Sequence, residues 1–171
     1  MLTRRSFVAG AACAAAASTL KAAGANDRIR VGVAGVRGRG SALAHEFASR
    51  ADAEVACICD VDSRLFEQRA AAIEKVQKKK PAAVQDLRAM LDDKSLDAAV
   101  VATMDRDHAG PAVACLDRGY DLLLEKAIAQ SWPQCRDILD RATAKRAIVG
   151  VCHVLRYTPY FRMMRHVVAS G

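Results

Sequence analysis

The chain has 171 residues, of which 52% are hydrophobic and 26% are charged. This composition is typical of one ordinary globular domain and argues against a disordered chain. The formal net charge is +7, but residues 1–25 hold three basic residues and no acid, which leaves +4 for the remainder. Because so small a surplus gives little electrostatic footprint, we expect no nucleic-acid partner.

The first 25 residues resemble an export signal. Thr3-Arg4-Arg5-Ser6-Phe7-Val8 is a twin-arginine pattern, an Ala-rich run follows, and Ala23-Gly24-Ala25 supplies the small residues that a signal peptidase needs. The run is too short and too weakly apolar for a stable membrane span. We therefore predict a signal peptide at 1–25, export to the periplasm, and a transient contact with the twin-arginine translocase. A chance Arg-Arg pair is the alternative.

Beyond the signal, short apolar runs alternate with longer amphipathic ones. The short runs suit buried strands, and the long ones suit helices that bury one face. We predict strands at 28–36, 54–60, 97–103, 121–124 and 147–151, and helices at 41–50, 63–79, 85–91, 108–118, 132–145 and from 160 onward. Apolar strands joined by helices imply βαβ crossovers, so the expected fold is α/β with a doubly wound parallel sheet.

Two other features carry no chemistry in this interpretation. Six cysteines show neither a CxxC pair nor a metal-ligand spacing, so we expect buried thiols and no metal site. Lys78-Lys79-Lys80 is interpreted as a solvated helix end, where cations complement the helix dipole, with a phosphate-binding patch as the alternative.

A glycine-rich loop follows the first predicted strand. Gly35-Val36-Arg37-Gly38-Arg39-Gly40 matches the dinucleotide-binding pattern GxGxxG at Gly35 and Gly40, while Arg37 replaces the middle glycine. Gly38 offers some compensating freedom, and Arg37 or Arg39 is placed to meet a phosphate directly. We assign Gly35, Gly38, Gly40 and Arg37 to the pyrophosphate of a dinucleotide.

An acid follows the second predicted strand. Asp60 lies twenty residues after Gly40, where a carboxylate accepts the ribose hydroxyls of the adenosine half. The same carboxylate repels a 2′-phosphate, which favours NAD over NADP, whereas the nearby Arg64 softens that preference. The alternative is a solvated Asp at a strand end. Together, the loop and the acid predict a Rossmann domain over residues 26–152.

Three further segments resemble the Gfo/Idh/MocA family, the glucose-fructose oxidoreductase and inositol dehydrogenase type. Residues 102–108 (ATMDRDH) are similar to its ATPxxxH turn, with Met104 in place of proline. Residues 124–129 (LEKAIA) are similar to its EKPxA segment, with Ala127 in place of proline. Residues 151–160 (VCHVLRYTPY) resemble the segment that leads into its second domain.

The resemblance implies roles for individual residues. Thr103 and His108 would border the nicotinamide half of NAD or NADP, with His108 also a catalytic candidate. Glu125 would hold the cofactor ribose or position Lys126, and Lys126 would assist proton transfer at the substrate hydroxyl. Arg156 and Tyr157 would lie at the junction of the two domains, near the substrate.

Each assignment has a plainer alternative. Glu125 and Lys126 also fit a surface pair at a strand end. His108 fits an ordinary residue at a helix start, and Arg156 fits an anchor of the turn between two domains. The missing proline at Ala127 removes a residue that fixes the turn in family members.

The resemblance also implies a second α+β domain, which we expect to begin at 153–171 and to be truncated here, so that this fragment alone is inactive. The expected function is hydride transfer between a nicotinamide cofactor and a sugar, cyclitol or polyol hydroxyl, in a parent protein that forms homo-oligomers. An NAD-dependent glycosidase of the same family and a non-catalytic nucleotide-binding remnant are the alternatives.

Overall fold

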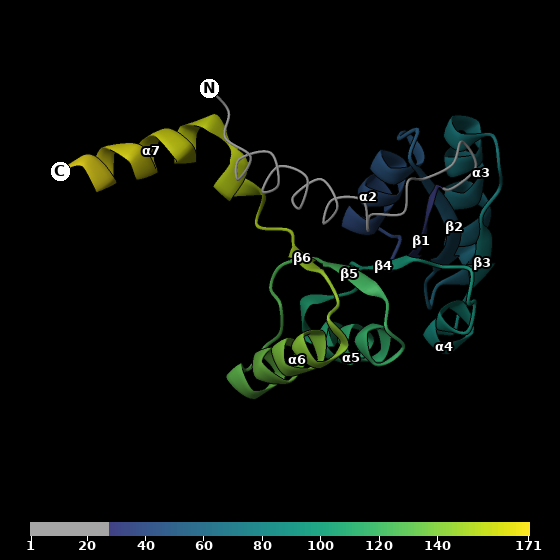
Figure 1. Cartoon of the computed structure of the whole chain (residues 1–171). Coiled ribbons are helices and arrows are strands. Elements are labelled where there is room, and N and C mark those ends of the chain that lie inside the picture. The colour runs from purple at the N-terminus through teal and green to yellow at the C-terminus, as the bar shows by residue number, and fades with distance from the viewer. Residues whose placement is uncertain (1–27) are drawn as a thin grey trace, which may run out of the picture.

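A computed structural model describes residues 28–171, so the predicted signal at 1–25 lies outside the described residues. A six-stranded, all-parallel sheet runs through the middle of the molecule in the order β3-β2-β1-β4-β5-β6 (Figure 1). The strands are β1 (Ile29–Ala34), β2 (Ala53–Cys59), β3 (Ala82–Val84), β4 (Ala98–Val101), β5 (Asp121–Leu124) and β6 (Val149–Val151). This order confirms the doubly wound α/β fold, because the chain reverses its direction of travel across the sheet between β3 and β4.

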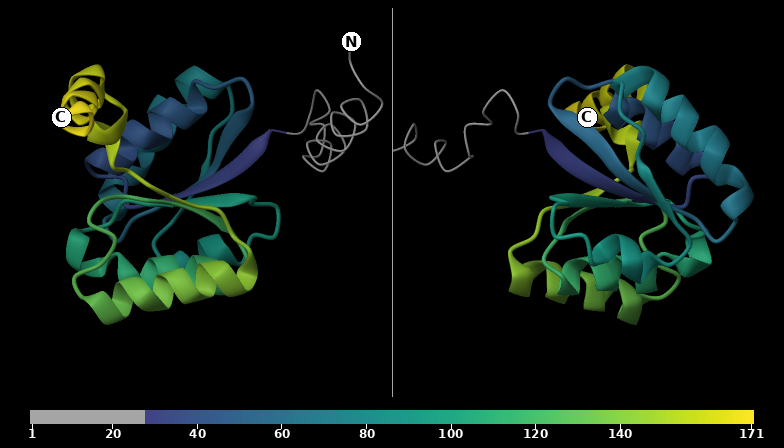
Figure 2. Two further views of the ribbon diagram at one scale, coloured as in Figure 1. Left: turned by 60° about the vertical axis from the view of Figure 1, so that its left-hand side comes forward. Right: turned by 90° about the vertical axis from the view of Figure 1, so that its right-hand side faces the viewer.

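Helices cover both faces of the sheet (Figure 2). On one face lie α2 (Arg39–Ala48) and α3 (Phe66–Gln77), and on the other lie α4 (Leu87–Leu91), α5 (Ala109–Asp117) and α6 (Trp132–Lys145). Three single 3₁₀ turns, η1 (Ser63–Leu65), η2 (Asp105–Asp107) and η3 (Val154–Tyr157), occur in the loops, and α7 (Pro159–Ser170) ends the chain. The predicted bounds of β5 and α6 are confirmed, and the other predicted elements differ by a few residues at their ends.

The sequence analysis did not predict β3. β3 pairs with β2 at the edge of the sheet, and its register joins Cys57 to Ala82 and Cys59 to Val84. The strand is three residues long and its residues are exposed or half-exposed, so it has no run of buried apolar side chains to reveal it. Our prediction of five strands was therefore wrong by this one edge strand.

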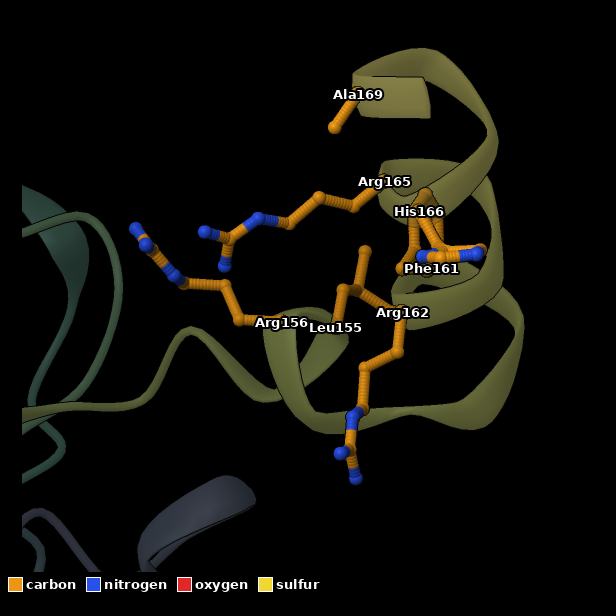
Figure 3. A pocket seen from close by; sticks show the side chains of 7 residues that line it. All are labelled: Leu155, Arg156, Phe161, Arg162, Arg165, His166 and Ala169. Atoms are coloured by element: carbon orange, nitrogen blue, oxygen red, sulfur yellow. The ribbon is translucent and has the colours of Figure 1, made fainter.

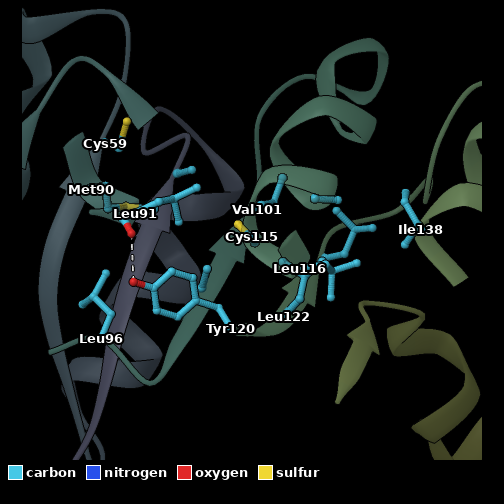
Figure 4. Close-up of a cluster of buried hydrophobic side chains, with 14 of the residues drawn as sticks. Cys59, Met90, Leu91, Leu96, Val101, Cys115, Leu116, Tyr120, Leu122 and Ile138 are labelled. Carbon is cyan, nitrogen blue, oxygen red and sulfur yellow. Dashed lines mark hydrogen bonds between the residues drawn. The ribbon is translucent and has the colours of Figure 1, made fainter. Parts of the chain in front are cut away.

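Two apolar cores lie on the two faces of the sheet. The first joins one face to α4, α5 and α6 and includes Leu91, Leu116 and Leu122 (Figure 4). In it the Tyr120 hydroxyl lies 2.9 Å from the carbonyl oxygens of both Leu91 and Asp93. The second joins the other face to α2 and α3. The last four residues of β1 and the last three of β4 are buried, as expected of apolar strands that are covered on both faces.

The lysine run and the cysteines lie as predicted. α3 ends at Gln77, and Lys78 takes the left-handed conformation with φ of 65° that often closes a helix. Lys79 pairs with Glu54 and Lys80 with Glu67. Four of the five described cysteines are buried.

Within residues 28–171, no helix is long and apolar enough to cross a membrane, and no cluster of metal-ligating side chains occurs.

Candidate functional site

The loops that follow the strands meet at one edge of the sheet, because all six strands are parallel. Gly35, directly after β1, has φ of +85°, and a Cβ atom there would lie 2.5 Å from the carbonyl oxygen of Ala102, after β4. Gly40 approaches the first loop even more closely, since its Cβ atom would lie 1.7 Å from the Gly35 carbonyl oxygen. Both positions therefore require glycine, and they fix the loop at the place where the strand order reverses.

The loop presents unpaired backbone donors at the start of α2. In the described part of the chain, the N–H groups of Gly38, Arg39 and Gly40 have no protein acceptor. A Cβ atom at Gly38 would meet nothing within 4 Å, so the backbone there faces open space. Free N–H groups at the positive end of a ten-residue helix suit a phosphate group. The pyrophosphate assigned from the sequence fits this cradle.

Asp60 closes the turn after β2 with both of its carboxylate oxygens. Oδ2 accepts the Val36 N–H at 2.8 Å, and Oδ1 accepts the Asp62 N–H at 3.0 Å. The carboxylate therefore ties the glycine loop to the second strand. Each oxygen keeps a further lone pair, so acceptance of ribose hydroxyl groups is compatible with these bonds.

Asp62 pairs with two arginines, Arg37, which the sequence analysis assigned to the pyrophosphate, and Arg64, which it placed near the adenosine ribose. Its Oδ2 atom lies 2.7 Å from Arg37 Nη2, and its Oδ1 atom lies 2.7 Å from Arg64 Nε. The Asp62 side chain is only 14% exposed, whereas those of Arg37 and Arg64 are 71% and 85% exposed. Hydrogen bonds from Arg64 lower the pKa of Asp62 to about 2, so its carboxylate stays charged at neutral pH.

A hollow of about 880 Å³ adjoins the loops after β4, β5 and β6. It brings together Thr103, His108, Glu125, Lys126 and Arg156, which the sequence analysis had assigned from separate segments. Lys126 is exposed, and no acid pairs with it within residues 28–171. A positively charged group that is free of a carboxylate partner thus lies on the wall of the hollow.

His108 lies fully buried beneath this wall, with an exposed fraction of 0%. Its Nδ1 atom lies 2.5 Å from the Ala127 carbonyl oxygen, and its Nε2 atom lies 3.2 Å from the Thr103 carbonyl oxygen. Because a carbonyl oxygen can only accept, whichever ring nitrogen carries a hydrogen atom donates it to the backbone carbonyl that it faces. Both ring nitrogens face the protein's own backbone, which favours a positioning role for His108 over proton transfer.

Glu125 is a buried carboxylate that links the hollow to the glycine loop. Its Oε1 atom accepts from Arg39 Nε at 2.7 Å, and its Oε2 atom accepts the Lys126 N–H at 3.1 Å. Burial works to raise the pKa of Glu125, but these bonds and the neighbouring Cys152 outweigh it, so the pKa is lowered. Burial, together with the Glu125 charge, raises the pKa of the Cys152 thiol to about 11.

The last predicted site residues lie on η3. Arg156 borders the main hollow and also a second one of about 650 Å³ between η3 and α7. In this second hollow the side chains of Arg156 and Arg165 extend in the same direction, toward the body of the molecule (Figure 3). Tyr157 is 77% exposed and does not line either hollow.

Comparison with known proteins identifies the family of this chain. Residues 29–153 match the family model described as "Oxidoreductase family, NAD-binding Rossmann fold". The chain belongs to the Gfo/Idh/MocA family. The expected resemblance is thereby confirmed, and the matched residues include the glycine loop and the loops after β2, β4 and β5.

Individual relatives support the same assignment. Inositol 2-dehydrogenase from Rubrobacter xylanophilus is 28% identical over 86% of this chain, which covers 42% of that protein. A glycosyl hydrolase family 109 protein from Stenotrophomonas maltophilia is 26% identical over 89% of this chain, which covers 36% of that protein. The structure of GenD2 from gentamicin A biosynthesis in complex with NAD superposes with a TM-score of 0.76 at 20% identity, over 85% of this chain and 40% of GenD2. The chain thus spans about two fifths of these proteins.

In this Gfo/Idh/MocA chain the candidate site contains residues that the sequence analysis did not place in it. Arg39 was considered only as a phosphate contact, yet its side chain turns to Glu125. Cys152 was expected to be a small buried residue, but it also lines the hollow, as does His153. The Arg39–Glu125 contact spans 86 residues of sequence, so no local pattern could have revealed it.

Proposed function

We propose that this chain binds a nicotinamide dinucleotide across the edge of the sheet and serves hydride transfer to or from a sugar, cyclitol or polyol hydroxyl. The observation that carries the proposal is the set of free N–H groups at the start of α2, where Arg39 also lines the hollow that holds Lys126. The inositol 2-dehydrogenase relative supports this substrate class.

Different residues would contact different parts of the cofactor and the substrate. Gly38, Arg39 and Gly40 would hold the pyrophosphate through backbone N–H groups, and Asp60 would accept the adenosine ribose hydroxyls. When bound, the nicotinamide ring supplies the hydride acceptor. Lys126 would bind the substrate hydroxyl and, in its neutral amine form, accept the hydroxyl proton as the hydride leaves the adjoining carbon for the nicotinamide ring. Glu125 holds the Lys126 backbone, and Arg156 would contact the substrate at the far wall.

The test is a titration of the purified chain with NADH and with NADPH, followed by nicotinamide fluorescence and by the melting temperature. We expect saturable binding that weakens at least tenfold in Asp60→Ala. A folded chain that binds neither dinucleotide would overturn the proposal and favour a non-catalytic remnant of the family. We further infer a preference for NADH, since the Asp60 carboxylate lies where a 2′-phosphate would approach.

A glycosidase reaction that proceeds through transient oxidation is the second candidate, because the glycosyl hydrolase family 109 relative aligns with most of this chain. Both reactions begin with oxidation of a substrate hydroxyl, and in both Lys126 would accept the proton of that hydroxyl. The residues of this domain therefore fit the dehydrogenase and the glycosidase equally well. Turnover of an aryl glycoside with no net change in NADH absorbance would support the glycosidase. Reduction of NAD by a free cyclitol would support the dehydrogenase.

We also propose that residues 1–25 direct export by the twin-arginine route. The support is the pattern Thr3-Arg4-Arg5-Ser6-Phe7 ahead of an Ala-rich run. Residues 1–27 fused to a folded reporter should carry it to the periplasm, and replacement of Arg4 and Arg5 by Lys should abolish that transport. Lys21→Gln is the matched control and should leave transport unchanged. A reporter that stays in the cytoplasm would contradict the proposal.

A further inference from the structure

The turn after β2 holds an ion-pair cluster that the proposed function does not use. Arg37 extends from the glycine loop and Arg64 from η1, and both meet the carboxylate of Asp62. Arg64 contacts it twice more, through Nη2 at 3.0 Å and through its backbone N–H at 3.2 Å. The cluster therefore joins the two loops between which the proposed function places the adenosine ribose.

The charges of this turn cancel. Asp60 and Asp62 bring two negative charges, and Arg37 and Arg64 bring two positive ones within one short stretch of surface. A 2′-phosphate carries up to two negative charges at neutral pH, and arginine is the side chain that binds such a group in a planar, two-pronged manner. Here, however, Asp62 already occupies both guanidinium groups, and its carboxylate would repel the phosphate.

We propose that Asp62 determines the choice between NAD and NADP by holding Arg37 and Arg64 in ion pairs, so that a latent 2′-phosphate site exists but is closed. This inference rests on the proposed function, because it concerns the same dinucleotide. In this proposal Asp62, Arg37 and Arg64 contribute to the discrimination between NAD and NADP, in addition to Asp60. It also gives Arg37, the residue that departs from the glycine pattern, a partner and a role.

The chain contains a matched control for the local structure. Asp86 begins α4 as Asp62 begins η1: each carboxylate accepts the backbone N–H and the guanidinium group of the arginine two residues later. Asp86 pairs only with Arg88 in the described part of the chain, and no arginine of the glycine loop reaches it. Asp86→Asn therefore removes the same local ion pair without affecting Arg37, while its amide oxygen can still accept the Arg88 N–H.

The experiment titrates the full chain with NADH and NADPH at fixed ionic strength. We expect the wild-type chain to bind NADH more tightly. Asp62→Asn should strengthen NADPH binding at least tenfold and change NADH binding less than threefold, while Asp86→Asn should change neither. Asp62→Ser, whose hydroxyl can also accept the Arg64 N–H, provides a second variant that lacks the carboxylate and keeps the cap. Adding Arg37→Gln and Arg64→Gln to Asp62→Asn should return NADPH binding to its wild-type level.

Each outcome has one meaning. An NADPH to NADH affinity ratio that is unchanged in both Asp62 variants would overturn this inference and leave the proposed function standing. A wild-type chain that prefers NADPH would overturn this inference and the NADH preference inferred above, and would leave dinucleotide binding standing. Failure of the folded wild-type chain to bind either dinucleotide would overturn the proposed function, and this inference with it.

Discussion

Arg39 and Glu125 lie 86 residues apart in the chain, and their side chains form an ion pair of 2.7 Å. Arg39 is the first residue of α2, in the glycine loop region, and Glu125 follows β5. The pair connects the donors proposed for the pyrophosphate to the loop that carries Lys126. Because the Glu125 side chain is 9% exposed and that of Arg39 is 51% exposed, the carboxylate depends on this partner more than the guanidinium does.

Loss of the Arg39–Glu125 pair should destabilise the fold in a pH-dependent way. Arg39→Gln removes the charged partner of the buried Glu125 carboxylate. We expect the free energy of unfolding to fall by about 1 to 2 kcal/mol at pH 7, because solvent around the half-exposed Arg39 side chain already weakens the ion pair. The pKa of Glu125 is lowered in the folded state, so its contribution is fully present above its ordinary value of 4.5 and is lost as the pH falls through the folded value.

Urea unfolding at pH 7, 5 and 4 measures this effect. The difference in unfolding free energy between the wild-type chain and Glu125→Gln should be constant from pH 7 to 5 and smaller at pH 4. Asp140→Asn serves as the control, because Arg136 and Asp140 form an exposed pair and its loss should cost less than about 0.5 kcal/mol. A difference that grows toward pH 4 would contradict the prediction.

Alanine substitutions at two glycines of the loop should distinguish an effect on folding from an effect on dinucleotide binding. Gly40→Ala places a Cβ atom 1.7 Å from the Gly35 carbonyl oxygen, which forces the backbone apart, so we expect a lower melting temperature and no NADH binding. Gly38→Ala adds a methyl group to open space and should leave the melting temperature within a few degrees of the wild-type value.

Gly38→Ala should nevertheless weaken NADH binding about tenfold, because the added methyl group would lie on the path of the pyrophosphate. Thermal unfolding and NADH fluorescence on the same samples distinguish the two effects. Unimpaired NADH binding by Gly38→Ala would show that the pyrophosphate lies elsewhere.

Removal of the His108 ring should disturb the wall of the hollow. In His108→Leu, the carbonyl oxygens of Ala127 and Thr103 lose their facing ring nitrogens inside the protein, and we expect a loss of about 2 to 4 kcal/mol in unfolding free energy. His166→Ala on the exposed surface of α7 is the control and should have no measurable effect. Equal stability of the two variants in urea would exclude the positioning role of His108.

The hydroxyl group of Tyr120 should contribute through its two carbonyl partners. Tyr120→Phe keeps the buried ring but leaves the carbonyl oxygens of Leu91 and Asp93 without this donor, so we expect a loss of about 1 to 2 kcal/mol. Tyr157→Phe, at a side chain that is 77% exposed, should change the stability by less than about 0.5 kcal/mol. Chemical denaturation measures the free energy of unfolding of both variants. A Tyr120→Phe variant as stable as the wild-type chain would contradict the prediction.

Much of the fold could be predicted because the buried strands are marked by local pattern. β5 and α6 were placed to the residue, since Gly119 and Ser131 mark clear boundaries beside them. β3 was missed because an exposed edge strand of three residues lacks both burial and length. In the same way, the burial of His108 could not be foreseen, since it results from packing of distant segments.

The candidate site was predictable where it follows from the ends of strands. Gly35, Asp60 and Glu125 each follow an apolar run, and parallel strands bring such positions to one edge. The partners of these residues were not predictable, because the pairing of Arg37 with Asp62 and of Arg39 with Glu125 depends on side-chain directions across loops. Tyr157 shows the converse: a residue next to Arg156 in sequence lies outside the hollow.

The two outer strands of the sheet have a consequence for solubility. β3 and β6 are each three residues long, so each side of the sheet presents few unpaired backbone groups to a neighbouring molecule. Lys78, Lys79 and Lys80 lie just before β3 and place positive charge beside it. Short edges and adjacent lysines are the devices by which sheets resist pairing with one another. The fold therefore protects its flanks against aggregation while the opposite ends of its strands stay open for ligands.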